Sequence, residues 1–212
     1  MKEGGIKISN YERLVKRRTL KDIEYYPTPV EIYETITTNP GWPYKRKAEF
    51  YITRDRALVC VLYLLAIRVS EALRLRKMQF LFPEDTGIQD RIIVRGIKLS
   101  KARRKEKLRK ELFRQENWLP LTGARAPLTQ FIVDYLNLLE KPDFLFPFNR
   151  TRAWQIVSLL TGSTCHWFRA FGEDFLYSQW NYDLLAVADY VKVDPRTLSQ
   201  YIRKRYEKYK PL

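Results

Sequence analysis

The stretch that decides the fold runs from Cys165 to Tyr201 and reads CHWFRAFGEDFLYSQWNYDLLAVADYVKVDPRTLSQY. It opens with the pattern His-x-x-Arg, in which helical spacing places His166 and Arg169 on one face. A guanidinium binds two phosphate oxygens in a fixed fork, and an imidazole exchanges a proton near neutral pH. Tyr201 follows His166 by thirty-five residues and offers a phenol that could act as a nucleophile. Because His-x-x-Arg alone occurs in many unrelated helices, the rest of the chain must support a site for phosphate chemistry.

The composition indicates a folded protein with a polyanionic partner. At 212 residues, 45% of them hydrophobic, the chain is long enough for one main core. Its 39 Lys and Arg against 24 Asp and Glu give a net charge of +15. Nucleic acid is the first candidate partner and a membrane surface is the alternative. No apolar run approaches the ~20 residues that span a bilayer, and the first ten residues lack a signal peptide, so we expect an intracellular, cytoplasmic protein.

The cysteine and histidine counts argue against a metal centre. Cys60 and Cys165 lie far apart and belong to no Cys-x-x-Cys motif, so we expect two free thiols. A zinc site of the usual kind needs more ligands than the single histidine of this chain offers. We therefore expect no metal and no cofactor.

Local patterns predict an α+β domain. Thr28, Pro29 and Glu31 form the start signal of a helix over 29–38, which the Pro- and Gly-rich stretch 39–43 ends. A core helix is predicted over 53–66, followed by a turn with Arg68 and a new helix capped by Ser70. Three strands are predicted, over 78–82, 90–98 and 118–121. The other predicted helices are 127–139, 152–160, the helix of His166, 184–191 and one from 195 onwards.

Two basic segments are candidate DNA contacts. Residues 1–27 are polar and basic and form a predicted arm, either solvated or laid along a DNA backbone. Between 98 and 110, eight of thirteen residues are Lys or Arg. This segment is either a solvated helical extension or a hairpin tip that contacts DNA, and in the second case the contacts come from Lys101, Arg103, Arg104 and Lys105.

The C-terminal part, residues 184–204, has the pattern of a helix-turn-helix. In this interpretation Arg196 and Arg203 face the major groove of DNA. A non-catalytic helix-turn-helix DNA-binding protein is therefore one possible function. Under it, Tyr201 is a packing or phosphate-contacting residue, and Arg68 has no role.

Taken together, four features resemble the tyrosine recombinase family, which includes phage and archaeal integrases. They are Arg68 in Arg-Val-Ser-Glu after an apolar helix, a lysine at the end of a following strand, His166-x-x-Arg169, and Tyr201 at the expected distance. The resemblance covers about Thr28 to Tyr206. It implies a basic arm over 1–27 and a catalytic domain over 28–212, mostly helical with a small three-stranded antiparallel sheet. An arm of this length is too short to form the family's N-terminal core-binding domain.

The resemblance also implies a role for each site residue. Tyr201 would attack the scissile phosphodiester, leaving a 3′-phosphotyrosyl link and a free 5′-hydroxyl, with His166 as proton acceptor or relay. Arg68 and Arg169 would hold the non-bridging oxygens, and Lys98, or alternatively Lys101, would protonate the leaving oxygen. Nine residues before Tyr201 the family usually has His or Trp, where this chain has Lys192. Tyr190, Tyr206 and Tyr209 are rival nucleophiles whose spacing from His166 fits less well.

The implied function is site-specific DNA recombination or integration without metal or ATP. The implied partner is double-stranded DNA, with a free monomer that assembles as a tetramer on DNA, in the nucleoid and encoded by a mobile element such as a virus or plasmid. A type IB topoisomerase-like enzyme shares the tyrosine chemistry and remains an alternative, because relaxation of DNA needs one subunit and strand exchange needs an assembly.

Overall fold

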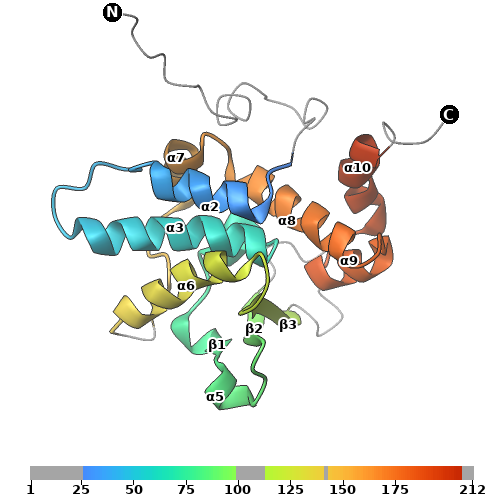
Figure 1. The fold of residues 1–212 in the computed structure, drawn as a ribbon, viewed down its shortest axis with the longest axis horizontal. Helices are drawn as coiled ribbons and strands as arrows, with labels where there is room; N and C mark the ends of the chain where they lie inside the picture. The colour runs from blue at the N-terminus through green and yellow to red at the C-terminus, as the bar shows by residue number, and fades with distance from the viewer. Residues whose placement is uncertain (1–25, 99–112, 141–142, 207–212) are drawn as a thin grey trace, which may run out of the picture.

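The computed structural model describes residues 26–98, 113–140 and 143–206, with the backbone alone at 113–115, 200, 201 and 203–206. Figure 1 shows the arrangement of the elements. The helices are α2 (Pro29–Thr38), α3 (Ala48–Leu64), α4 (Val69–Ala72), the 3-10 helix η2 (Lys77–Gln79), α5 (Pro83–Thr86), α6 (Ala126–Leu138), α7 (Arg150–Thr161), α8 (Cys165–Gln179), α9 (Leu184–Val191) and α10 (Pro195–Tyr206), and the strands are β1 (Phe80–Leu81), β2 (Arg91–Lys98) and β3 (Phe113–Pro120). Among these helices none has both the length and the apolar run that a membrane crossing requires.

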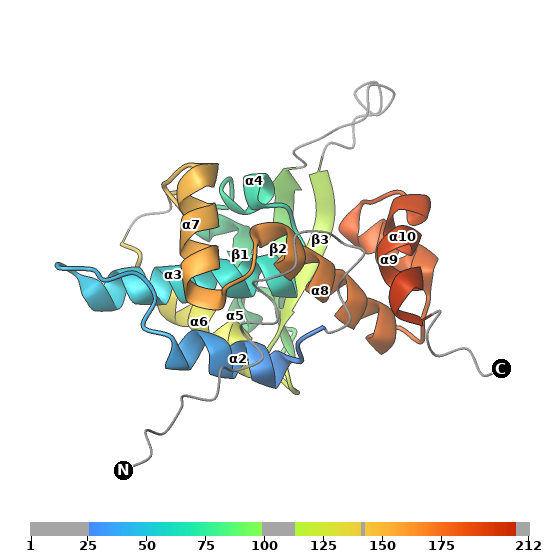
Figure 2. The same cartoon turned by 90° about the horizontal axis from the view of Figure 1, so that it is seen from above.

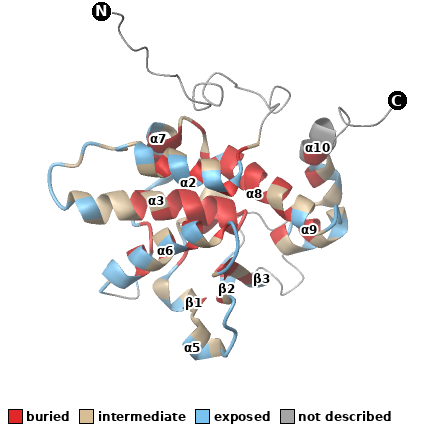
Figure 3. Ribbon diagram, in the orientation of Figure 1, coloured by how far each residue is buried: buried red, intermediate tan, exposed pale blue. Residues whose placement is uncertain are grey.

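Helix α3 is the centre of the core. Every side chain from Ala57 to Ile67 is fully buried, which agrees with its prediction as a core helix that is apolar on all sides. Helices α6, α7 and α8 pack against it, and the burial colours of Figure 3 show the buried residues gathered on its second half and on α8. The residues that follow α3, including Arg68, are therefore fixed at the edge of the core.

Gly172 lets α8 and α3 lie in direct backbone contact. A Cβ atom at this position would collide with the carbonyl oxygen of Tyr63 and would lie 3.3 Å from the Cβ of Ala66. Only glycine permits this approach, because it carries no Cβ. The contact brings the start of α8, with His166 and Arg169, to the turn that follows α3.

The sheet is antiparallel in the order β1-β2-β3. Val94 of β2 pairs with Phe80, and Lys98 at the end of β2 pairs with Phe113. Gly96 bends β2 with a positive φ of 66°, and the side-chain amide of Gln79 donates to the carbonyl oxygens of Arg95 and Gly96 at 2.9 and 2.8 Å. The expected α+β class with a small three-stranded sheet is confirmed.

Helices α9 and α10 form a second, smaller cluster at one end of the molecule (Figures 1 and 2). Leu198 and Ile202 of α10 are buried in it together with Ala66 and Leu176. Ala66 comes directly after α3 and has a positive φ of 48°. The cluster therefore joins α10 to the same turn that carries Arg68.

Several predicted boundaries are confirmed and others are wrong. The helix over 29–38 has the predicted capping box between Thr28 and Glu31. The predicted helix 53–66 in fact begins at Ala48 and ends at Leu64, because its first turn is partly exposed and lacks the all-round apolar pattern. Ser70 is not a cap, since Arg68 holds the N-cap position and Ser70 lies inside α4. Strand β3 begins at Phe113 instead of 118, because its first half is too polar to show a strand pattern.

Candidate active site

Arg68 lies at the N-cap position of α4, where its backbone is extended. Its Nη1 atom donates to Oε1 of Glu71 at 3.0 Å, and its backbone N–H donates to Oε2 of the same carboxylate at 2.8 Å. The Glu71 side chain is fully buried, whereas that of Arg68 is 33% exposed. Glu71 thus holds both the backbone and the guanidinium of Arg68, and part of the Arg68 side chain stays accessible to a ligand.

Arg169 is held in the same way, by a carboxylate one helical turn further along α8. Its Nε atom donates to Oε1 of Glu173 at 2.7 Å, and both side chains are about 5% exposed. A buried ion pair at this spacing fixes the guanidinium strongly, because either charge left alone would be poorly solvated. The sequence signal that could have found Glu173 is its position four residues after Arg169, on the same face of the helix.

His166 stands at the surface beside these arginines. Partial desolvation lowers the pKa of the imidazole, Arg169 and Arg68 lower it further, and Glu173 opposes them by raising it. The interaction with Arg68 joins two residues that are ninety-eight positions apart in the sequence. Arg68, His166 and Arg169 therefore lie close enough for the two guanidiniums to act on the imidazole, and we call these three residues the cationic triad.

The two candidate lysines with described side chains belong to other elements. Lys98 is the last residue of β2 and is exposed. Lys192 ends α9 with a left-handed backbone, and its Nζ atom pairs with Oδ1 of Asp189 at 2.9 Å. In the described part of the chain, neither is among the charges that shift the pKa of His166. Lys101, Arg103, Arg104 and Lys105 lie outside the described residues.

Tyr201 lies in α10, three residues after Leu198 and one before Ile202. Leu198 and Ile202 are both buried in the cluster that contains Ala66. Arg203 lies in the same helix, and Arg196 is exposed at its start, where its backbone N–H donates to Oδ1 of Asp194 at 2.9 Å. Helices α9 and α10 are joined by the three residues Lys192, Val193 and Asp194, as the helix-turn-helix pattern predicted.

Tyr190 anchors α9 to the edge of the sheet. Its hydroxyl oxygen accepts a hydrogen bond from the backbone N–H of Trp118 at 3.2 Å, and its ring contacts Trp118 and Trp180 edge to face. Among the rival tyrosines, Tyr206 lies in α10 and Tyr209 lies outside the described residues. A structural role therefore accounts for Tyr190.

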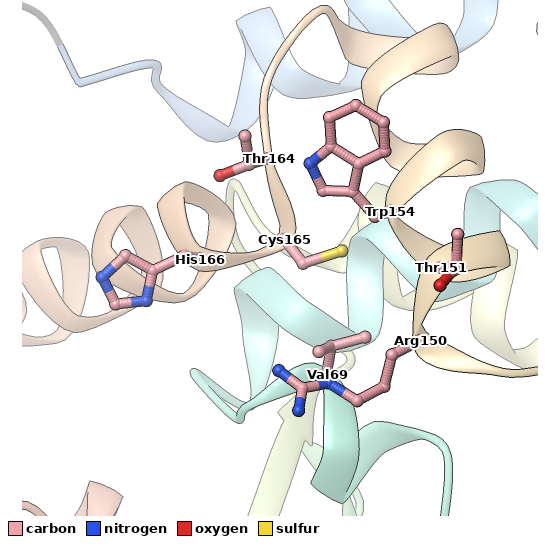
Figure 4. Close-up of a pocket in the computed structure, with 7 residues that line it drawn as sticks. All are labelled: Val69, Arg150, Thr151, Trp154, Thr164, Cys165 and His166. Atoms are coloured by element: carbon pink, nitrogen blue, oxygen red, sulfur yellow. The ribbon is translucent and has the colours of Figure 1, made fainter. Parts of the chain in front are cut away.

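A cleft of about 610 Å³ adjoins His166. It is lined by Val69, Thr164, Cys165, His166 and, from the first turns of α7, Arg150, Thr151 and Trp154. Figure 4 shows the Arg150 side chain alongside Val69, with the Trp154 indole standing across from it beyond Cys165. Sequence reasoning did not select Arg150 or Trp154, and the signal for them is weak, since one exposed Arg and one exposed Trp on an amphipathic helix are common.

Both cysteines are buried and free, as predicted. Burial raises the pKa of the Cys165 thiol to about 12, although it lies against the cleft. At neutral pH the thiol is therefore protonated and is not a nucleophile.

Comparisons with known proteins bear on the fold. No family model and no curated protein matches the chain. Two crystal structures of the XerH site-specific recombinase resemble it. The pre-cleavage complex with a difH substrate has a TM-score of 0.58 at 16% identity and covers 94% of this chain and 61% of the XerH chain. The post-cleavage complex with a palindromic difH substrate has a TM-score of 0.57 at 16% identity and covers 94% of this chain and 62% of XerH. The chain spans about three fifths of the XerH length, and the similarity shows a shared α+β fold.

Proposed function

We propose that this protein is a site-specific DNA recombinase of the integrase type, which cleaves and rejoins DNA through a 3′-phosphotyrosyl intermediate. The observation that supports it best is the cationic triad: Arg68 and Arg169 both act on the pKa of His166, and Val69, the residue after Arg68, lines the same cleft as His166. A fold shared with a site-specific recombinase supports the same activity.

In the proposed reaction Tyr201 is the nucleophile and the triad serves the phosphate. The phenol oxygen bonds to phosphorus, the bond from phosphorus to the 5′-oxygen breaks, and the phenolic proton passes to His166. A neutral imidazole is the form that accepts this proton, which agrees with its lowered pKa. Arg68 and Arg169, held by Glu71 and Glu173, bind the non-bridging oxygens as their negative charge increases.

Two lysines complete the proposed chemistry. Lys98, or alternatively Lys101, gives a proton to the leaving 5′-oxygen, and Lys192 donates to a phosphate oxygen. Lys98 is exposed at the end of a strand, as such a role requires. One phosphate ester is exchanged for another of similar energy, so the cycle needs no external energy source.

The proposal includes the domain division and the partners. Residues 28–212 form the catalytic domain, and the arm 1–27 contacts DNA together with Lys101, Arg103, Arg104, Lys105, Arg196 and Arg203. The substrate is double-stranded DNA, which the net charge of +15 suits. The protein is a monomer in solution and a tetramer on its target DNA, in the nucleoid of a cell that carries a mobile element.

The test is trapping of the covalent intermediate. The protein is incubated with a pool of nicked duplexes that includes the attachment sequences of the mobile element, and the products are separated under denaturing conditions. We expect a protein–DNA adduct whose modified peptide contains Tyr201, and loss of the adduct in Tyr201→Phe and Arg169→Ala. Tyr190→Phe is the matched control and keeps the adduct, because it removes only the hydroxyl that accepts from Trp118 and retains the ring contacts with Trp118 and Trp180.

A second candidate function is a non-catalytic helix-turn-helix DNA-binding protein. Two helices joined by a three-residue turn, with Arg196 exposed at the start of the second, favour it. Tight binding to an attachment sequence without any adduct would support this function and refute the recombinase. An adduct on Tyr190 or Tyr206 would keep the chemistry and refute the assignment of Tyr201.

A further inference from the structure

The cleft beside His166 has an exposed aromatic wall and an uncharged, apolar floor. Trp154 is 52% exposed, whereas Ala153 and Val157 of the same helix are fully buried, so α7 turns its indole toward solvent and the cleft. Cys165 is 6% exposed and carries a neutral thiol, and Val69 contributes a further apolar wall. An exposed indole that lines a cleft together with polar and cationic groups offers a flat apolar surface on which a ligand can pack.

The rim of the cleft favours an anion. Arg150 is exposed at the first position of α7, a helix of 12 residues whose N-cap is Asn149. The positive end of the helix dipole and the guanidinium act together on a phosphate at this point. None of the lining residues is acidic.

The combination of a flat aromatic wall and a cationic rim matches a nucleotide, whose base is apolar on its faces and whose phosphate is anionic. An intact duplex does not offer this combination, because its bases are stacked and only their edges and the backbone are accessible. A base that has rotated out of the duplex exposes its faces and can stack on an aromatic side chain. Because His166 forms part of the wall, such a nucleotide would be a close neighbour of the phosphate on which the triad acts.

We infer that this cleft binds an unstacked nucleotide of the DNA strand next to the reacting phosphate, with the base on Trp154 and the adjoining phosphate on Arg150. The inference rests on the proposed function for the position of the reacting phosphate. It adds α7 to the DNA-contacting elements, since none of the site residues predicted from the sequence lies in this helix. It also gives a role to the exposed indole of Trp154, which lines the same cleft as His166.

The test compares two fluorescently labelled duplexes that differ only in three consecutive mismatched pairs, which open easily. We expect the protein to bind the mismatched duplex about tenfold more tightly, since unstacking then costs less. Trp154→Ala should reduce this preference to less than about threefold, because the stacking surface is lost. Arg150→Gln should weaken binding to the mismatched duplex as well. Leu159→Ala is the matched control, since Leu159 is 40% exposed on the same helix but does not line the cleft.

Three results would overturn the inference. The first is that the wild type binds both duplexes with equal affinity. The second is that Trp154→Ala, with unchanged thermal unfolding, still prefers the mismatched duplex as strongly as the wild type does. The third is that the protein self-associates and Trp154→Ala abolishes this while the preference for the mismatched duplex persists. The last result would make the cleft a contact between protein molecules. An adduct at Tyr201 without any mismatch preference keeps the proposed function and rejects the inference. A Trp154-dependent mismatch preference without an adduct keeps the binding of an unstacked nucleotide in the cleft and rejects the recombinase function.

Discussion

At the scale of single residues, the chain has the advantage that His166 is its only histidine. A titration of the imidazole by NMR therefore needs no assignment. We expect a midpoint below about 6.5, the ordinary histidine pKa, because desolvation and the two arginines of the triad disfavour the imidazolium. Between the lowered pKa and the ordinary one, the unfolded chain binds more protons than the folded protein, so the stability contributed by His166 increases as the pH rises.

Two substitutions should move this midpoint in opposite directions. Arg68→Gln should raise the His166 pKa, since it removes a cation, and Glu173→Gln should lower it further, since it removes the anion that raises it. Unfolded protein in urea is the control and should titrate near about 6.5. If both variants shift the midpoint in the same direction, the triad does not exist as described.

Glu173 should also be important for stability. Glu173→Ala leaves the guanidinium of Arg169 buried without its partner, and the loss of one member of a buried ion pair costs about 3–5 kcal/mol. The control is Glu116→Ala, whose partner Arg95 is 58% exposed and for which we expect a loss of about 1 kcal/mol or less. Urea unfolding of both variants measures the difference, and similar losses would show that Arg169 does not depend on Glu173.

At the scale of elements, the contact of α8 with α3 determines where the triad lies. In an ordinary helix interior, Gly→Ala stabilises a protein by about 0.5–1 kcal/mol. We expect Gly172→Ala to destabilise the protein instead, because the new methyl group would collide with the Tyr63 carbonyl. Overpacking of this kind typically costs about 1–3 kcal/mol of the free energy of unfolding. Denaturant unfolding measures this change in the free energy of unfolding.

Gly87→Ala is the control that separates collision from backbone strain. Gly87 has a positive φ of 72° and no atom within 4 Å of an added Cβ, so only the strained backbone contributes there. Gly172→Ala should be the more damaging change, and it should also shift the NMR signal of His166, because α8 must move. A stabilised Gly172→Ala variant would contradict the close packing of the two helices.

The elements also show what the sequence could and could not predict. Helices with strong end signals, such as α2 with its capping box and α9, were predicted with their observed bounds. The first half of β3 was not predicted, because Arg114, Gln115 and Glu116 have no strand pattern, and this part of the strand is defined by the pairing of Arg114 and Glu116 with β2. The triad residues were proposed through resemblance to a family. Glu173 could have been found from its i,i+4 spacing to Arg169, whereas no local pattern indicated Arg150 and Trp154, because their significance depends on the tertiary neighbours that form the cleft.

At the scale of the whole molecule, the densest run of basic residues, 98–110, begins at the last residue of β2. Lys98 and Phe113 are paired, so the segment between them leaves β2 and returns to β3 at adjacent positions. It contains most of the charge run between 98 and 110. Whether this run is a solvated extension or a contact with DNA determines how binding responds to salt, because each phosphate that the protein neutralises releases counterions.

We expect the substitution of Lys101, Arg103 and Arg104 by Gln to reduce the slope of log affinity against log salt concentration by about 3, since each phosphate contact contributes about 0.9. The matched control replaces Lys45, Arg46 and Lys47, three exposed cations ahead of α3, and removes the same number of charges from the net +15. Fluorescence anisotropy on one duplex between about 50 and 200 mM salt measures both slopes. If only a general attraction between a basic protein and DNA operates, the two variants have equal slopes. If the segment contacts phosphates directly, the slope is reduced only in the variant that lacks Lys101, Arg103 and Arg104. Equal slopes would therefore assign the charge run to a solvated extension and leave the arm and α10 as the proposed DNA contacts.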